Sequence, residues 1–185
     1  MNIKAGFTPD MLELLKAMKG KTFKSYECTS VGPWGYTDGI VRLNLGRFAI
    51  DVTCDLHELD GDPGGYDEMT WLSCREVPLN SEFNPRISAE PRQYLVNEVI
   101  TGLELVRDHV DDASGECTID MDMAITIRTK YHTFTFSRDI SFDDTIAVRV
   151  SDADAPPDGV NPVEEVWPGT DAGAMNVTRI AVPLC

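Results

Sequence analysis

The residues best suited to binding chemistry lie in "DLHELDGDPGGYDEMTWLS", residues 55–73, which joins two segments that alternate like β-strands. Acidic side chains and glycines crowd this stretch, and carboxylate oxygens are ligands that Ca²⁺ prefers. Counted from Asp60 as an EF-hand loop, position five is Gly64 and position twelve is Trp71, so two expected oxygen ligands are missing. The sequence therefore predicts either a solvated turn or a Ca²⁺ site of another kind, with the ligands Asp60, Asp62, Asp67 and Glu68.

Two of the three histidines could contribute to a catalytic metal site. His109 and Asp111 form an H-x-D pattern, whose side chains share one face of a strand. With His132 they would make the two-His-one-carboxylate set of non-haem iron enzymes. No nucleophile elbow, phosphate-binding loop, dinucleotide fingerprint or H-E-x-x-H motif is present in the sequence. We therefore expect a non-catalytic protein, with a metal-dependent enzyme as an alternative.

A third candidate is "VGPWGYTDG", residues 31–39, where glycines and a proline surround two aromatic residues. Trp34 and Tyr36 on a loop are suited to anchoring a protein partner or stacking on a ligand. The alternative is that both rings fold back and close one end of the core.

One helix is predicted, over residues 8–20. Thr8 is suited to the N-cap and Pro9 to the first turn, and Gly20 is placed for the C-terminal cap. Apolar residues recur at helical spacing and form one stripe, which predicts a helix that covers one end of a sheet core.

After the helix, the hydrophobic period changes to two. In "CTIDMDMAITIR" every odd position from Cys117 to Ile127 is apolar, which is typical of a half-buried strand. The segments "GIVRLNLG", "RFAIDVT", "HTFTFS" and "TIAVRVS" alternate in the same way. Such alternation favours an antiparallel sheet, because strands of a buried parallel sheet are apolar throughout.

The patterns of residues 38–56 and 122–140 match without a gap when the chain is shifted by 84 residues, and the strands upstream correspond if a few residues are inserted. The two units that result are residues 21–78 and 94–151. We therefore expect a single α+β domain, mainly antiparallel, in which two similar four-stranded units form one sandwich or barrel with the N-terminal helix packed on it. Residues 79–93 are predicted to be the connector, and residues 152–185 a loop-rich tail that ends in an edge strand.

Charge and cysteine content limit the partners and the compartment. The net charge of −15 disfavours nucleic acid and anionic membranes, and no apolar run of about 20 residues is present. The five cysteines are widely spaced and odd in number, and no secretion signal is apparent, so we expect a cytoplasmic protein with reduced thiols. The expected function is a binding or assembly module that meets a protein partner or a second copy through its acidic surface and loops. A small-ligand or Ca²⁺-binding barrel is the alternative.

Overall fold

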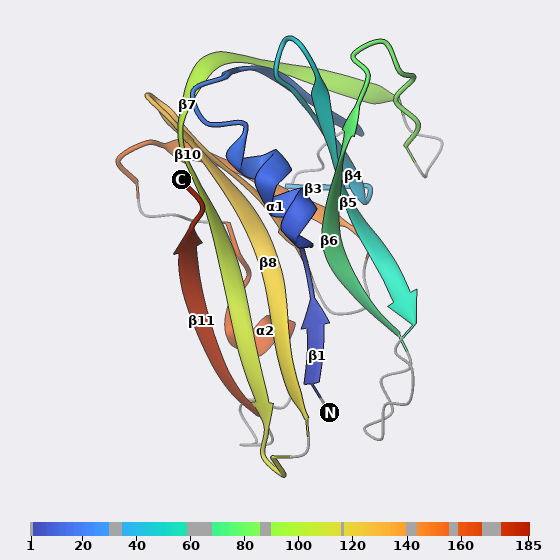
Figure 1. The fold of residues 1–185 in the computed structure, drawn as a ribbon, viewed down its shortest axis with the longest axis vertical. Coiled ribbons are helices and arrows are strands. Elements are labelled where there is room, and N and C mark those ends of the chain that lie inside the picture. The colour runs from blue at the N-terminus through green and yellow to red at the C-terminus, as the bar shows by residue number, and fades with distance from the viewer. Residues whose placement is uncertain are drawn as a thin grey trace.

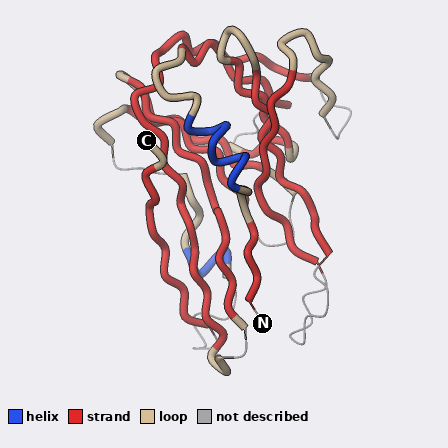
Figure 2. The backbone as a smooth tube through the Cα atoms, in the orientation of Figure 1, coloured by secondary structure: helices blue, strands red, loops and turns tan. Residues whose placement is uncertain are grey.

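The computed structural model describes residues 2–29, 35–58, 68–85, 90–115, 117–139, 144–155, 159–167 and 175–185. These residues form two helices and one sheet of 11 strands, so strands dominate the fold (Figure 1, Figure 2). The prediction of a mainly antiparallel sheet with a small helix is confirmed. The sheet is not closed on itself, so it does not form the predicted barrel. The sandwich and the internal duplication stay predictions.

The elements follow the order expected from the sequence, with three additions, β1, the two-residue β3 and α2. The first half of the chain contains β1 (Asn2–Ala5), α1 (Pro9–Lys16), β2 (Thr22–Thr29), β3 (Tyr36–Thr37), β4 (Ile40–Asn44), β5 (Ala49–Glu58) and β6 (Glu68–Val77). The second half contains β7 (Pro91–Asp112), β8 (Thr118–Thr129), β9 (His132–Arg138), β10 (Ile146–Asp152), α2 (Val163–Val166) and β11 (Met175–Pro183).

The sheet consists of two antiparallel meanders joined at their first strands. Its order is β3-β10-β9-β8-β7-β2-β4-β5-β6, while β1 pairs in parallel with β8 and β11 pairs antiparallel with β7. Strand β7 is 22 residues long and belongs to both halves. Its first part pairs with β2 as far as Val99, and its second part pairs with β8 from Ile100 onward. Figure 1 shows β7 curving over the top of the molecule between the two halves.

The main core lies between the two halves and includes α1. Val41, Ile50 and Leu72 of the first half share one cluster with Ile125 and Phe136 of the second. Figure 1 shows α1 in front of this region, between β8 and β6. The helix presents Leu15 to the same core, and Met18 follows in the next turn, both fully buried. The apolar stripe thus covers the core as predicted.

Helix α1 is shorter than the sequence predicts. The Thr8 hydroxyl accepts from the Met11 N–H, so the predicted N-cap is confirmed. The helix ends at Lys16, before the predicted end at residue 20, and a turn leads to Gly20, which has a φ of +76°. The Gly20 N–H donates to the carbonyl of Ile100, so a bond to β7 replaces the last helical turn.

A smaller second core lies beside β1 and α2. The register of β7 against β8 shifts between Val106 and Arg107, as at a β-bulge. Beyond this shift, Ile119 and Met121 pack with Trp167, whereas Ile125 belongs to the main core. The predicted exposed face of β8 is also covered, since Asp122 is 2% exposed and Thr126 fully buried. Tertiary contacts from β1 and from residues 159–167 thus override the alternating pattern.

Candidate functional site

Of the six site residues predicted in the two loops, four lie outside the described residues: Trp34, Asp60, Asp62 and Asp67. Glu68, by contrast, is the first residue of β6 and stands directly opposite Glu58 of β5. Two like charges therefore face each other at the base of the acidic loop, an arrangement that destabilises a strand pair.

Tyr36 does not project freely from its loop. It lies in β3, which pairs with β10, and its side chain is half-buried. The guanidinium of Arg149 lies 5.4 Å from the ring centroid, and Nδ2 of Asn161 lies 3.5 Å from the hydroxyl. These contacts hold the ring against the sheet edge.

The predicted iron-type triad is not brought together. His109 contacts Asp120 through Nδ1 at 2.7 Å and Asp111 through Nε2 at 3.3 Å. His132 instead contacts Glu98 through Nδ1 at 2.7 Å. Glu98 and His109 are 11 positions apart on β7, which at about 3.3 Å per residue is roughly 35 Å of strand. Among the described residues, no three histidine, cysteine or acidic side chains form a group that could hold a metal ion.

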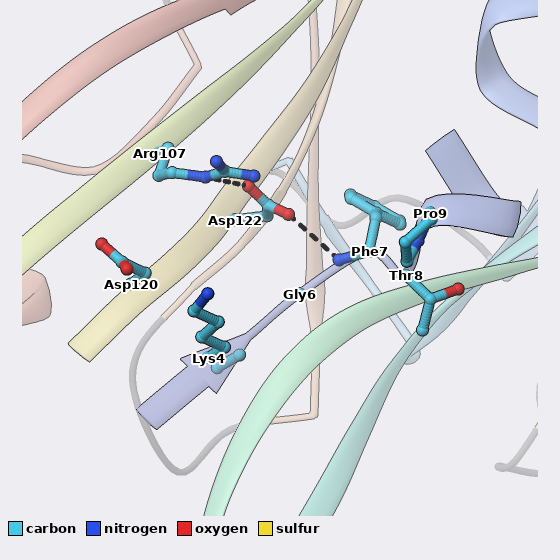
Figure 3. Close-up of a pocket in the computed structure, with 9 residues that line it drawn as sticks. Lys4, Gly6, Phe7, Thr8, Pro9, Arg107, Asp120 and Asp122 are labelled. Carbon is cyan, nitrogen blue, oxygen red and sulfur yellow. Dashed lines mark hydrogen bonds and ion pairs between the residues drawn. The ribbon is translucent and has the colours of Figure 1, made fainter. Parts of the chain in front are cut away.

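A polar pocket of about 320 Å³ lies where β1 leads into α1, against β7 and β8 (Figure 3). Asp122 at its base accepts from the backbone N–H of Phe7 at 3.0 Å and from Nε of Arg107 at 2.8 Å. A Cβ atom at Gly6 would clash with Oδ2 of Asp122, so only glycine permits this approach. The bond from Phe7 attaches the N-terminal segment to β8, and the bond from Arg107 joins β7 to β8. We therefore assign this buried carboxylate a structural role.

A larger pocket, which we call the aromatic groove, has a volume of about 500 Å³ and is lined by β2, β7, β9 and β10. Tyr26 and Tyr94 stack in its wall with ring centroids 4.8 Å apart and planes inclined by 10°. Phe134 meets Tyr26 edge-on at 6.3 Å. Burial, more than any neighbouring charge, raises the pKa of Tyr26 to about 12, so its phenol is neutral at physiological pH. The wall is therefore aromatic and uncharged.

One polar pair, His132 and Glu98, also lines the aromatic groove. Oε2 of Glu98 accepts from the Thr129 hydroxyl at 2.6 Å, and Oε1 lies 2.7 Å from Nδ1 of His132. Burial raises the pKa of Glu98, but the hydrogen bonds from Thr129 and His132 outweigh this effect, so the pKa is lowered and the group is ionised. An ionised carboxylate only accepts, so Nδ1 carries the proton. In the neutral ring, Nε2 is then a hydrogen-bond acceptor.

An irregularity in β7 shapes the rim of the groove. The register of β2 against β7 shifts between Phe23 and Ser25, and Asn97 has a φ of +59°. Asparagine tolerates this left-handed conformation better than most residues. Leu95 lies on the groove within this irregular stretch and is 76% exposed. A large apolar side chain is thus held in solvent beside an aromatic wall.

Sequence reasoning identified one member of this groove, His132, and assigned it to a different site. Tyr26, Tyr94 and Glu98 carried no motif, because they come from strands whose pairing is not local. The one usable signal is the asparagine in "QYLVNEVI", since asparagine inside an apolar strand is typical of a bulge.

None of the described helices is long and apolar enough to cross a bilayer. The chain matches no family model, and comparison with curated proteins and with solved structures gives no significant match.

Proposed function

We propose that this protein is a non-catalytic assembly module that pairs with a second copy of itself through the edge strand β11. The observation that carries this proposal is that β11 has a strand partner on one side only among the described residues and carries no exposed charged side chain.

Strand β11 pairs with β7 over nine residues, from Met175 to Pro183. On its other side it has no partner among the described strands. Its one charged residue, Arg179, turns towards Asp108, with Nε and Nη2 both 2.7 Å from the carboxylate oxygens. The exposed positions carry Asn176, Thr178, Ile180, Ala181 and Pro183, none of which is charged. An edge of this kind is a template for another strand.

Three other edge strands of the sheet, β6, β1 and β3, have protective features. Strand β6 carries the exposed charges Glu68, Arg75 and Glu76. Strand β1 is four residues long and has Lys4 on its exposed side, and β3 is only two residues long. Charges and short strands are the devices that keep sheet edges from pairing. Strand β11 is nine residues long and has no exposed charged side chain, and its one protective feature of this kind is Pro183 at its last position. In a chain with a net charge of −15, an edge of this length without exposed charge favours a role in association.

A second copy suits this edge because an antiparallel strand pair can be self-complementary about a two-fold axis. Each copy is strongly acidic, so contacts between most surfaces are repulsive. The uncharged edge is where two copies can approach with the least repulsion, and Ile180, 47% exposed, adds apolar surface there.

The topology supports the same proposal. In the first meander, β2 pairs with β4 on one side and β7 on the other. In the second, β7 pairs with β8 on one side and β11 on the other. We propose that the meanders are the two repeats expected from the sequence, packed as a sandwich. In that scheme β11 pairs with the first strand of the second repeat as β7 pairs with the first strand of the first repeat. A further strand added to β11 would continue the sheet.

We also propose a cytoplasmic location, supported by the five cysteines, none of which forms a disulfide. The loop of Trp34 and Tyr36 stays a predicted contact for other protein partners.

Sedimentation equilibrium and light scattering test the assembly. We expect the wild type to have twice the chain mass of 20.5 kDa at micromolar concentration. Thr178→Lys with Ile180→Lys places two like charges on each edge and is expected to yield monomers that keep the wild-type circular dichroism. Leu79→Lys, a similar substitution at a partly exposed apolar residue outside the strands, is the matched control and should stay dimeric. A wild type that is monomeric at 100 µM, a concentration chosen for the assay, would refute the proposal, as would a dimer unaffected by the two lysines.

A further inference from the structure

We propose that the aromatic groove is a binding site for a small, flat, neutral aromatic molecule that donates a hydrogen bond to Nε2 of His132. This site is separate from the β11 edge and does not depend on the proposed assembly.

The size and walls of the groove define the class of ligand. A volume of about 500 Å³ lies within the range of small-molecule sites, roughly 300–1,000 Å³. The stacked rings of Tyr26 and Tyr94, with Phe134 across them, form a wall that favours a planar ring over a flexible chain. A few fixed polar groups within such a wall are characteristic of ligand sites.

The His132–Glu98 pair supplies the polar contact. Nδ1 of His132 is hydrogen-bonded to one oxygen of Glu98, and the other oxygen accepts from the Thr129 hydroxyl. Nδ1 and each carboxylate oxygen therefore already have a hydrogen-bond partner. The remaining acceptor is Nε2, on a side chain that is 42% exposed and lines the groove. A ligand N–H or O–H satisfies this nitrogen, whereas an acceptor does not.

The charge of the groove excludes anions. Glu98 is the ionised group in its lining, and the chain as a whole carries a net charge of −15. A carboxylate or phosphate on the ligand would be repelled by both. A neutral aromatic donor avoids this repulsion.

Two further observations point to a ligand rather than to a solvated surface. Leu95 is 76% exposed and Val150 is 48% exposed, so two apolar side chains border the groove in solvent. Asn97, two residues from Leu95, has a left-handed backbone conformation of the kind that clusters at ligand clamps. A flat molecule stacked on Tyr94 would cover the exposed apolar rim.

The test uses indole, which has an N–H donor, and 1-methylindole, which has the same ring system and no donor. We expect indole to shift the backbone amide resonances of Leu95 and Val96 in a saturable titration, and to shift the Nε2 resonance of His132. We expect 1-methylindole to bind about five- to tenfold more weakly, the loss for one hydrogen bond, and to leave Nε2 unshifted. Benzoate, an aromatic anion, should not bind.

The matched variants are His132→Phe and His109→Phe, which replace two half-exposed histidines that each contact a carboxylate. His132→Phe should bind both indoles equally, whereas His109→Phe should keep the wild-type preference for indole. If His132→Phe does not fold, the shift of the Nε2 resonance in the wild type still tests whether indole donates a hydrogen bond to His132. Absence of saturable binding at 5 mM indole, the highest concentration of the titration, would overturn the proposal. Equal affinity of the wild type for the two indoles would also overturn it, as would resonance shifts confined to residues outside the groove. The proposal would likewise fail if a second copy of the chain covered the groove at the protein concentration of the titration.

Discussion

Replacing Asp51 by asparagine is expected to destabilise the protein strongly, because it leaves the buried Arg42 without the buried carboxylate that pairs with it. Asp51 and Arg42 are 1% and 8% exposed at their side chains. They form two parallel hydrogen bonds, from Nε to Oδ1 at 2.7 Å and from Nη2 to Oδ2 at 3.0 Å. Asparagine keeps the shape and removes the charge.

The size of the expected loss in unfolding free energy follows from the surroundings of Arg42. Breaking a buried ion pair by removing one partner costs about 3–5 kcal/mol. Arg42 retains hydrogen bonds to the carbonyls of Ser81 and Glu82, so we expect the lower end, about 3 kcal/mol. For a domain of this size each kcal/mol lowers the midpoint by about 2–4 °C, so the expected fall is roughly 6–12 °C.

Arg75 provides a matched control on the same carboxylate. Its Nη2 lies 3.9 Å from Oδ2 of Asp51, but its side chain is 73% exposed. Exposed pairs contribute about 0–1 kcal/mol, so Arg75→Ala is expected to stay within that range of the wild type. The double variant Arg42→Met with Asp51→Leu removes both charges and should recover much of the loss, since replacing a whole buried pair by apolar side chains is often neutral.

Urea unfolding at one fixed protein concentration, followed by circular dichroism and tryptophan fluorescence, measures these differences. The reasoning would be refuted if Asp51→Asn cost less than about 1 kcal/mol, or no more than Arg75→Ala. It would also be refuted if the double variant were as unstable as Asp51→Asn alone.

Three further predictions concern histidine, cysteine and calcium. The hydrogen bond to Asp120 raises the pKa of His109 above 6.5, so its stabilising contribution is complete below pH 6.5 and is lost as the pH rises through the folded-state pKa; a pKa at or below 6.5 in an NMR titration would contradict this. Burial raises the pKa of Cys28 to about 11 and of Cys74 to about 12, whereas Cys185 is exposed, so a thiol reagent should label Cys185 first and reach the other two only on unfolding, as mass spectrometry of the labelled peptides would show. If the acidic loop binds Ca²⁺, saturation at about 100 times Kd adds roughly 2.7 kcal/mol and raises the melting temperature by several degrees; equal effects of Ca²⁺ and Mg²⁺, or an effect that persists in Asp60→Asn with Asp62→Asn, would count against the site.

Elements governed by local sequence were predictable. The cap at Thr8 and the stripe that ends in Leu15 and Met18 produced the expected helix start and buried face. The alternating segments became β4, β5, β8, β9 and β10 close to their expected positions. Side-chain period and capping depend on residues within four positions of one another, so the chain determines them before any long-range contact forms.

The aromatic groove was not predictable from the sequence, because the sequence lists its residues but does not show that they lie together. His132 was placed with His109 and Asp111 because sequence reasoning had only residue types and spacing. The structure places it instead beside Glu98, 34 positions earlier in the chain. Arg42 likewise alternates as an outward residue, yet residues 81–83 cover it, with Phe83 5.3 Å from its guanidinium.

By itself, then, the sequence determined the predominance of antiparallel strands, the start of the helix and the acidic character of the surface. Only the tertiary structure decided the strand order, the long β7 shared by both halves, the parallel addition of β1 and the isolation of β11 at an edge. The physical reason is that a strand's alternation states which side chains are apolar but not which strand it will meet. Pairing and covering depend on shape and burial summed over residues far apart in the chain, and these decide which polar side chains become buried ion pairs and which line a groove.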